Sequence, residues 1–285
     1  MHEFDLIKKY FSKISKRNKA ALNLTDDVFF DKKKGLVISV DTYNQGSHFL
    51  DFKKPDLVIK KIIRSSISDL ICKGVDPKFY FISGSGNKKT FSKINLSQIS
   101  KSLNQEQKKY KVFLSGGDTA FSNKLNFSIT SVGYSKKIIY RNKAKYNDDI
   151  YVTGNLGDSF IGLKILKNEI IDISDGLITD LDKMISKQNL SYKLFENYIP
   201  VSQRLLKLIK EKNLNKSKLI SNGDDYQILF TASPSKSRII LNTTKNLGVK
   251  ITKIGKIISG NKKPIIINQK GRQIVINNKG HTHQF

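Results

Sequence analysis

"LSGGDTAFS", residues 114–122, joins a short apolar run to two adjacent glycines, an aspartate and a threonine. A strand that ends in a polar, glycine-containing turn is typical of α/β proteins, which bind ligands at such turns. Gly116 and Gly117 would let main-chain amides approach a phosphate closely. Asp118, in a chain of net charge +27, suggests a bound cation. The stretch therefore predicts a strand followed by a turn that binds phosphate and metal.

Strands and helices alternate on both sides of this stretch. In the first half, β-rich runs predict strands at 36–41, 78–83, 111–115 and 125–134, and apolar periodicity predicts helices at 55–73 and 95–109. A polar, charged segment at 135–149 separates the halves. The second half has predicted strands at 149–154, 170–174, 226–232, 249–258, 264–268 and 273–277, with helices starting near 158 and 175 and a helix over 235–246. We therefore predict an α/β (α+β) protein with two domains, residues 1–137 and 138–285.

The composition excludes several classes of protein. No apolar run approaches the roughly 20 residues of a membrane span. The start, "MHEFDLIKKYFSKI", is typical of an amphipathic helix and lacks the apolar core of a signal peptide. The chain has a single cysteine, Cys72, on an apolar helical pattern that places it in the core; it excludes an internal disulfide and a multi-cysteine metal site. We expect a cytoplasmic protein without a membrane partner.

The 51 lysines and arginines first suggest a nucleic-acid partner. However, the basic residues are spread along the whole chain, with no dense arm or tail. The sequence also lacks zinc-finger spacing and an aromatic ribonucleoprotein motif. We expect no nucleic-acid partner, and the positive field would instead attract anionic substrates.

The 24 acidic residues recur beside glycine, serine or another acid, in "TDD" (25–27), "SVDT" (39–42), "SD" (68–69), "GGDT" (116–119), "DISDG" (172–176) and "NGDD" (222–225). A single aspartate after a strand is more often part of an Asx-turn or a helix cap. Repeated aspartates without histidine or cysteine partners are typical of Mg²⁺ sites that phosphate groups complete. Together the clusters predict phosphoryl transfer, although no P-loop and no protein-kinase motif is present.

Taken in order, the clusters resemble one family, thiamine-monophosphate kinase. The resemblance runs through "TDDVFF", "VISVDTYNQGSHFL", "SISDLICKGVDPKFYF", "FLSGGDT", "IDISDGLITDLDKM" and "SNGDDYQILFT". It implies that ATP phosphorylates thiamine phosphate to thiamine diphosphate, assisted by several Mg²⁺ ions. It also implies an N-terminal ATP- and Mg²⁺-binding domain whose mixed sheet pairs into a β-barrel in a homodimer, and a C-terminal α/β domain.

The resemblance also implies roles for single residues. The implied metal positions are Asp27, Ser39, Val40 (through its main chain), Asp41, Asp69, Asp118, Asp172 and Asp175, of which Asp41, Asp118 and Asp175 are the catalytic set. The implied nucleotide contacts are Gly117, Asp118, Arg141 and Ser174. The implied substrate contacts are His48, Asp224 and His281.

Three departures from the family leave an alternative open. The chain joins the "GDS" helix almost directly to Asp172, where the family has a few dozen more residues, so the insertion of the second domain is shortened. Asp224 stands where the family usually has glutamate, and His281 where it tends to have an aromatic residue. The alternative is an inactive nucleotide-binding relative that lost its activity with the deleted segment.

Overall fold

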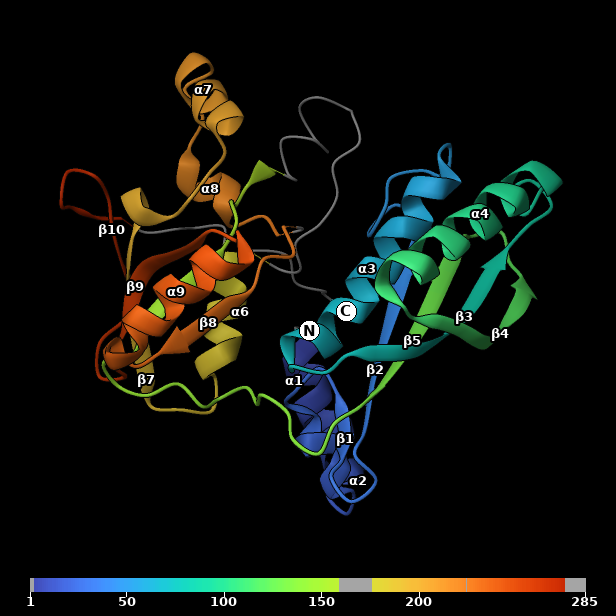
Figure 1. Cartoon of the computed structure of the whole chain (residues 1–285), viewed down its shortest axis with the longest axis horizontal. Coiled ribbons are helices and arrows are strands. Elements are labelled where there is room, and N and C mark those ends of the chain that lie inside the picture. The colour runs from blue at the N-terminus through green and yellow to red at the C-terminus, as the bar shows by residue number, and fades with distance from the viewer. Residues whose placement is uncertain (1–2, 159–175, 224, 275–285) are drawn as a thin grey trace. The chain divides into compact units, whose positions relative to one another are not determined.

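The computed structural model describes residues 3–158, 176–223 and 225–274. The chain divides into two compact units, Met1–Tyr140 and Arg141–Phe285 (Figure 1). Each unit combines one β-sheet with several helices, so the predicted mixed α/β class is confirmed.

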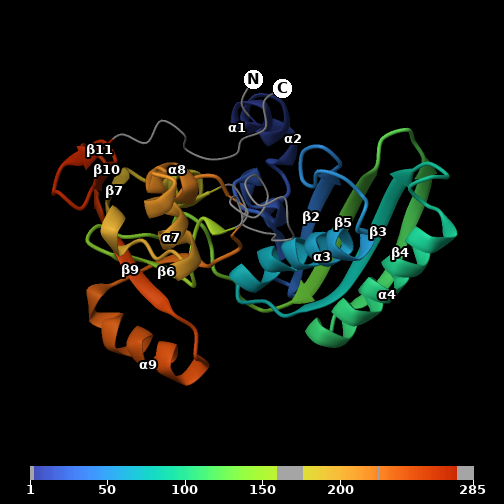
Figure 2. The same cartoon turned by 90° about the horizontal axis from the view of Figure 1, so that it is seen from above.

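The first unit is built on a five-stranded sheet of strand order β1-β2-β5-β3-β4. Strands β3 and β4 are parallel, and the other neighbours are antiparallel. Helices α3 and α4 cover one face of this sheet (Figure 2). Its elements are α1 (Glu3–Leu6), a π-helical turn (Ile7–Phe11), α2 (Ser12–Ser15), a 3-10 segment (Lys19–Leu24), β1 (Phe29–Asp31), β2 (Leu36–Asn44), α3 (Pro55–Cys72), β3 (Pro77–Gly86), α4 (Lys93–Tyr110), β4 (Phe113–Phe121) and β5 (Asn126–Tyr134).

Helix α3 forms where the sequence predicts it, because its start and stop signals are local. Pro55 occupies the first turn, where its missing N–H costs no hydrogen bond, and Gly74 follows the helix with a φ of +71°. Ile59, Ile62 and Ile63 are completely buried against the sheet. Cys72 is exposed, so its predicted place in the core is wrong; as the last helical residue, it lies beyond the face that packs.

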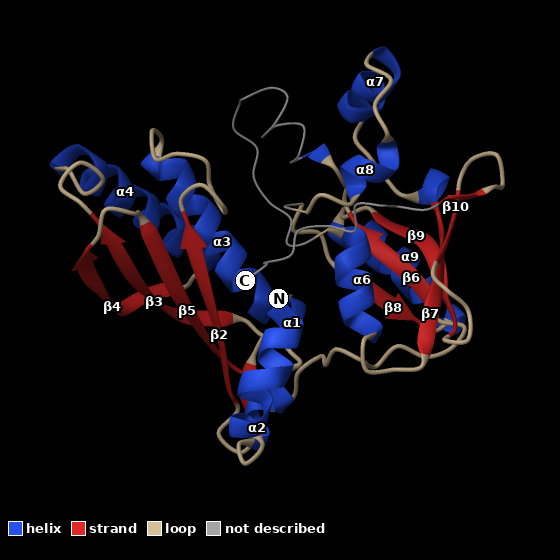
Figure 3. Cartoon of the chain, turned by 180° about the vertical axis from the view of Figure 1, so that it is seen from behind, coloured by secondary structure: helices blue, strands red, loops and turns tan. Residues whose placement is uncertain are grey.

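The second unit contains a six-stranded sheet of order β11-β10-β7-β9-β6-β8, in which only the β10–β7 pair is parallel among the described strands (Figure 3). Its elements are β6 (Asp149–Thr153), α6 (Leu177–Ile185), β7 (Leu190–Phe195), a 3-10 turn (Glu196–Tyr198), α7 (Gln203–Glu211), α8 (Lys216–Ile220), β8 (Leu229–Ala232), a 3-10 turn (Pro234–Lys236), α9 (Ser237–Leu247), β9 (Ile251–Ser259), β10 (Ile265–Ile267) and β11 (Gln273–Ile274). Leu181 and Ile185 of α6 belong to the same buried apolar cluster as Ile150 and Ile254 of the sheet.

Some elements of the second unit differ from the prediction. Strand β7 and helices α7 and α8 have no predicted counterpart. The strand predicted at 226–232 begins only at Leu229, because Tyr226 has a φ of +39° and the Thr153 hydroxyl accepts the Ile228 N–H at 2.8 Å. The strand predicted at 170–174 lies outside the described residues. No helix in the described part of the chain is long and apolar enough to cross a membrane.

The buried hydroxyl of Tyr80 is expected to lower the free energy of unfolding. Its side chain is buried, and its hydroxyl has no hydrogen-bond partner among the described residues. Burial raises the pKa of Tyr80 to about 12. An unpartnered buried hydroxyl costs free energy, so Tyr80→Phe is expected to raise the free energy of unfolding by about 1 kcal/mol at neutral pH.

The difference between the two proteins should widen in alkali. Above pH 10 the unfolded tyrosine releases its proton while the folded one retains it, so wild-type stability falls between about pH 10 and 12. Tyr80→Phe lacks this contribution. Urea unfolding at several pH values measures both effects, and a less stable variant at pH 7 would show that the hydroxyl is satisfied.

Candidate active site

The register of the first unit's sheet places alternate residues of each strand on opposite faces. Residues paired across neighbouring strands share a face. One such row across β2, β5 and β3 consists of Ser39, Ser131 and Tyr80, and the next consists of Val40, Thr130 and Phe81. The first row is buried under α3, where Ser131 hydrogen-bonds to Ser66 at 2.8 Å. The second row lies on the uncovered face, where Val40 is 63% exposed.

Three of the predicted site residues gather on the helix-covered face around β2. The Ser39 hydroxyl donates to Asp69 Oδ2 at 2.5 Å, which connects β2 to the last turns of α3. Asp41 is half-buried and lies in the middle of β2, which continues to Asn44. The expectation that Asp41 ends a strand is therefore wrong, because β2 stays paired with β5 as far as Asn44.

Asp27 is held near the same end of α3 through its neighbour. Asp26 forms a buried ion pair with Lys73, the residue that follows α3. Asp26 Oδ1 also accepts the Asp27 N–H at 2.9 Å. Because Lys73 lies one helical turn after Asp69, the end of α3 organises both predicted metal positions.

His48 lies in the loop that follows β2. Its Nδ1 accepts the N–H of Asn44 at 3.0 Å, and the Asn44 carbonyl accepts the His48 N–H at 3.0 Å. Its ring contacts Tyr43 edge to face, with ring centres 5.8 Å apart. The Tyr43 hydroxyl donates to Asp41 Oδ2 at 3.1 Å. Sequence reasoning missed Tyr43, which connects a predicted metal ligand with a predicted substrate contact.

The prediction of a glycine turn at 116–119 is wrong, because these residues lie within a strand. Strand β4 runs from Phe113 to Phe121, and its register with β3 shifts at the glycines: Tyr80 pairs with Leu114 and Ile82 with Gly117, so β4 contains one extra residue. A β-carbon on Gly117 would overlap the Ile82 carbonyl oxygen, so the close approach that requires glycine is to the neighbouring strand. The strand predicted at 111–115 was expected to end before the glycines. It continues as β4 to Phe121 because β3 extends beside it to Gly86.

Asp118 lies on β4 and is exposed, and its Oδ1 accepts the Thr119 N–H at 2.8 Å. The register pairs Asp118 with Ser83, Ser83 with Ser128, and Ser128 with Thr42, a row on the uncovered face. Asp41 is three strands away, which is about 14 Å, and on the other face. Within one chain these two carboxylates therefore cannot bind the same metal ion.

The remaining predicted site residues are not brought together within the described structure. Val40 lies on the uncovered face, and Arg141 is the half-buried first residue of the second unit. Asp172, Ser174, Asp175, Asp224 and His281 lie outside the described residues. In the part of the chain that the structure describes, no group of three or more histidines, cysteines, aspartates and glutamates could hold a metal ion.

Two glycines of the second unit, Gly157 and Gly176, lie close to residues that precede β8. The Gly157 N–H donates to the Asp225 carboxylate, and a β-carbon on Gly176 would overlap the Ser221 carbonyl oxygen. The Asp158 carboxylate accepts the Ser202 hydroxyl at 2.6 Å. Asp225 is a further residue that sequence reasoning missed, although its position beside Asp224 in "NGDD" was a signal.

The donor chemistry of the described set fits Mg²⁺. Asp27, Asp41, Asp69 and Asp118 supply carboxylates and Ser39 supplies a hydroxyl, and Mg²⁺ prefers such oxygen ligands. The Ser39–Asp69 contact already places two of these donors together. Because Asp41 and Asp118 are so far apart, a single Mg²⁺ ion in one chain cannot bind all of these donors.

The chain is similar to known proteins over almost its full length. Residues 18–135 match the family described as "AIR synthase related protein, N-terminal domain". The thiamine-monophosphate kinase of Buchnera aphidicola subsp. Schizaphis graminum is 30% identical over 324 aligned positions, which cover 99% of this chain and 98% of that protein. The thiamine-monophosphate kinase of Haemophilus influenzae is 31% identical and covers 90% of this chain and 89% of its own length.

A solved structure shows that the fold is shared as well. The structure described as "AaThiL complexed with AMPPCP and TMP" has a TM-score of 0.82, with 24% sequence identity, 99% coverage of this chain and 97% coverage of that one. The Buchnera alignment spans 324 positions, whereas this chain has 285 residues, so at least 39 positions of the alignment are gaps in this chain. A deletion relative to that kinase is therefore present.

Proposed function

The chain belongs to the thiamine-monophosphate kinase family, and we propose that it transfers the γ-phosphoryl group of ATP to the phosphate of thiamine phosphate, giving thiamine diphosphate and ADP. The observation that carries this proposal is the match to named kinases at 30% identity over 99% of the chain. The gathering of oxygen donors around β2 and the end of α3 agrees with it.

The proposed reaction does not require a side chain that acts as a strong general base. The attacking oxygen of thiamine phosphate is already anionic, a new P–O bond forms to the γ-phosphorus, and the bond from the γ-phosphorus to the bridging oxygen of ADP breaks. Asp27, Ser39, the Val40 main chain, Asp41, Asp69, Asp118, Asp172 and Asp175 would hold the Mg²⁺ ions. Mg²⁺, when bound, would supply positive charge that offsets the repulsion between the two phosphate chains.

The other proposed contacts position the two substrates. Gly117, Asp118, Arg141 and Ser174 would bind the nucleotide, where the Arg141 guanidinium suits a phosphate with two parallel hydrogen bonds. His48, Asp224 and His281 would bind thiamine phosphate. The His48 Nδ1 accepts the Asn44 N–H, so in the neutral ring the proton is on Nε2, which suits a hydrogen bond to an anionic substrate.

We also expect a homodimer in which two copies of the sheet form a barrel. The uncovered face of the sheet exposes apolar side chains, including Val40, Phe81 and Phe113, of which Phe113 is 56% exposed. Strand β4 is a nine-residue edge strand, and every residue in it is exposed. A long exposed edge favours pairing with another chain.

The kinase assay tests the proposed function directly. The purified chain with ATP, Mg²⁺ and thiamine phosphate is expected to form thiamine diphosphate, separated from the substrate by anion-exchange chromatography. A reaction without Mg²⁺ and one with thiamine in place of thiamine phosphate serve as controls. Absence of product, combined with ATP binding in a calorimetric titration, would favour the alternative of an inactive nucleotide-binding relative.

That alternative has one observation in its favour, the deletion relative to the Buchnera kinase. Against it, the described metal aspartates Asp27, Asp41, Asp69 and Asp118 are all retained. A chain that had lost catalysis would not be expected to retain all four of these carboxylates. The expected cytoplasmic location stays a prediction.

A further inference from the structure

Tyr43 lies between two residues of the proposed site and contacts both. Its hydroxyl donates to Asp41 Oδ2 at 3.1 Å, and its ring packs edge to face against the His48 ring. Residues two apart on a strand share a face, so Tyr43 and Asp41 lie together on the helix-covered face. The Tyr43 side chain is only 3% exposed.

Packing alone does not account for a tyrosine at this position. The ring belongs to an apolar cluster with Phe49, Phe52 and Phe127, where phenylalanine would fill the same space. The hydroxyl is the part that needs a polar partner when buried, and the Asp41 carboxylate supplies it. The bond occupies Oδ2 of Asp41 and so restricts the rotation of that carboxylate.

The Tyr43 ring also contacts the His48 ring. The imidazole is held from its Nδ1 side by the Asn44 N–H at 3.0 Å, and the Tyr43 ring limits its tilt. One buried side chain thus sets the orientation of a proposed metal ligand through its hydroxyl and of a proposed substrate contact through its ring.

We propose that Tyr43 is a positioning residue that orients Asp41 for Mg²⁺ and His48 for thiamine phosphate. Hydrogen bonds from outside the ligand set orient metal ligands, and removing such a bond typically weakens metal binding about 10- to 100-fold. This inference rests on the proposed function. The two contacts are chemically separable, because the hydroxyl reaches the metal ligand and the ring reaches the histidine.

Two substitutions separate the contacts. Tyr43→Phe removes only the hydroxyl, and it is expected to weaken Mn²⁺ binding about tenfold while the KM for thiamine phosphate at saturating metal stays unchanged. Tyr43→Leu also removes the ring and is expected to raise that KM as well. Mn²⁺ binding to the full chain is measured by the loss of its free electron-spin-resonance signal, which does not depend on catalysis.

A matched control exists in the second unit. Tyr192 is also buried, and its hydroxyl donates to Asp182 Oδ1 at 2.8 Å. Tyr192→Phe therefore removes the same kind of bond from the same kind of pair, and it is expected to leave Mn²⁺ binding at the wild-type level. Circular dichroism establishes that each variant is folded. If Tyr43→Leu unfolds, Mn²⁺ binding by Tyr43→Phe still tests whether the hydroxyl orients Asp41.

The outcomes are distinct. Weaker Mn²⁺ binding in Tyr43→Phe but not in Tyr192→Phe supports the proposal. Equal Mn²⁺ binding by wild type and Tyr43→Phe overturns it, as does a wild-type chain that binds no Mn²⁺. If Tyr43→Phe weakens Mn²⁺ binding but the wild type forms no thiamine diphosphate, the positioning of Asp41 by Tyr43 stands and the proposed function fails.

Discussion

Asp118→Asn is expected to lower turnover about 100-fold or more while changing the free energy of unfolding by less than about 0.5 kcal/mol. The substitution removes a full negative charge from a proposed metal ligand. Asp118 is exposed on an edge strand and makes a hydrogen bond to the adjacent Thr119 N–H, which the asparagine oxygen can also accept. Steady-state kinetics at saturating Mg²⁺ and urea unfolding measure the two quantities.

Asp31→Asn is the matched control for this substitution. Asp31 is half-buried at the end of β1, its carboxylate accepts the main-chain N–H groups of Lys33 and Lys34, and it has no role in the proposed site. We expect wild-type turnover for it. Wild-type turnover in Asp118→Asn as well would remove Asp118 from the metal set.

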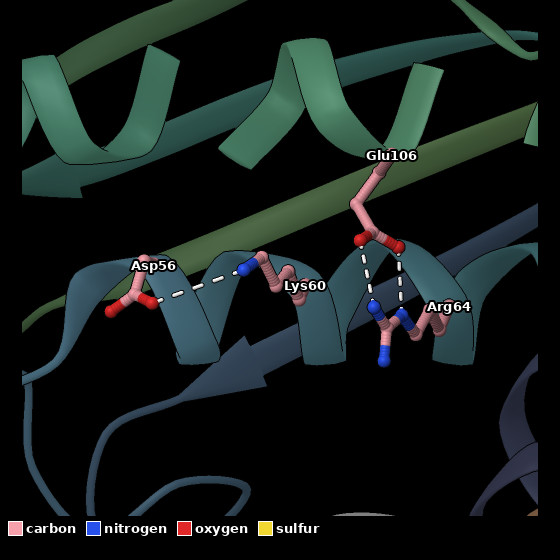
Figure 4. Close-up of polar contacts among 4 residues, drawn as sticks. All are labelled: Asp56, Lys60, Arg64 and Glu106. Carbon is pink, nitrogen blue, oxygen red and sulfur yellow. Dashed lines mark hydrogen bonds and ion pairs between the residues drawn. The ribbon is translucent and has the colours of Figure 1, made fainter. Parts of the chain in front are cut away.

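Arg64→Met is expected to lower the free energy of unfolding by about 2 to 4 kcal/mol. Arg64 of α3 donates two parallel hydrogen bonds to Glu106 of α4, from Nε at 2.7 Å and from Nη2 at 2.8 Å (Figure 4). The Glu106 side chain is only 3% exposed, whereas that of Arg64 is 41% exposed. Removing the arginine leaves a buried carboxylate without its main cationic partner, and partial access of water reduces the penalty.

Lys60→Met on the same helix is the control. Lys60 faces Asp56 one turn away at 3.9 Å, near the surface, and such pairs contribute only a few tenths of a kcal/mol (Figure 4). Urea unfolding should therefore show a small change for Lys60→Met and a large one for Arg64→Met. The double variant Arg64→Met/Glu106→Leu should recover most of the loss, and equal effects of Arg64→Met and Lys60→Met would contradict a role for the buried charge.

Much of the first unit could be predicted because its signals are local. The helix over 55–72 is marked by Pro55, by apolar residues at helical spacing and by Gly74, and these act within one or two turns. The strand β5 follows from alternation along its own residues. Strand β7 and helix α7 were missed in the second unit, where "LSYKLF" and "QRLLKLIKE" are short and lack strong boundary residues.

The candidate site was predictable only as a set of residue types. The clustered aspartates indicate hard oxygen ligands, and the resemblance orders them into roles. The glycines before Asp118 were interpreted as a turn, because paired glycines suit a turn and their partner strand is invisible along the sequence. Gly117 is required by the Ile82 carbonyl of a neighbouring strand, 35 residues earlier in the chain, and Gly116 lies against the Phe81 side chain of the same strand.

The sequence by itself determined the α/β class, the main helices and the kind of ligand that the acidic residues suit, because periodicity, caps and donor chemistry are properties of neighbouring residues. Only the tertiary structure decided which face of the sheet each aspartate occupies, that Tyr43 connects Asp41 with His48, and that Asp118 is separated from Asp41. Strand register settles these points. A register is a pairing between distant segments, and a shift of one residue would move every side chain to the opposite face.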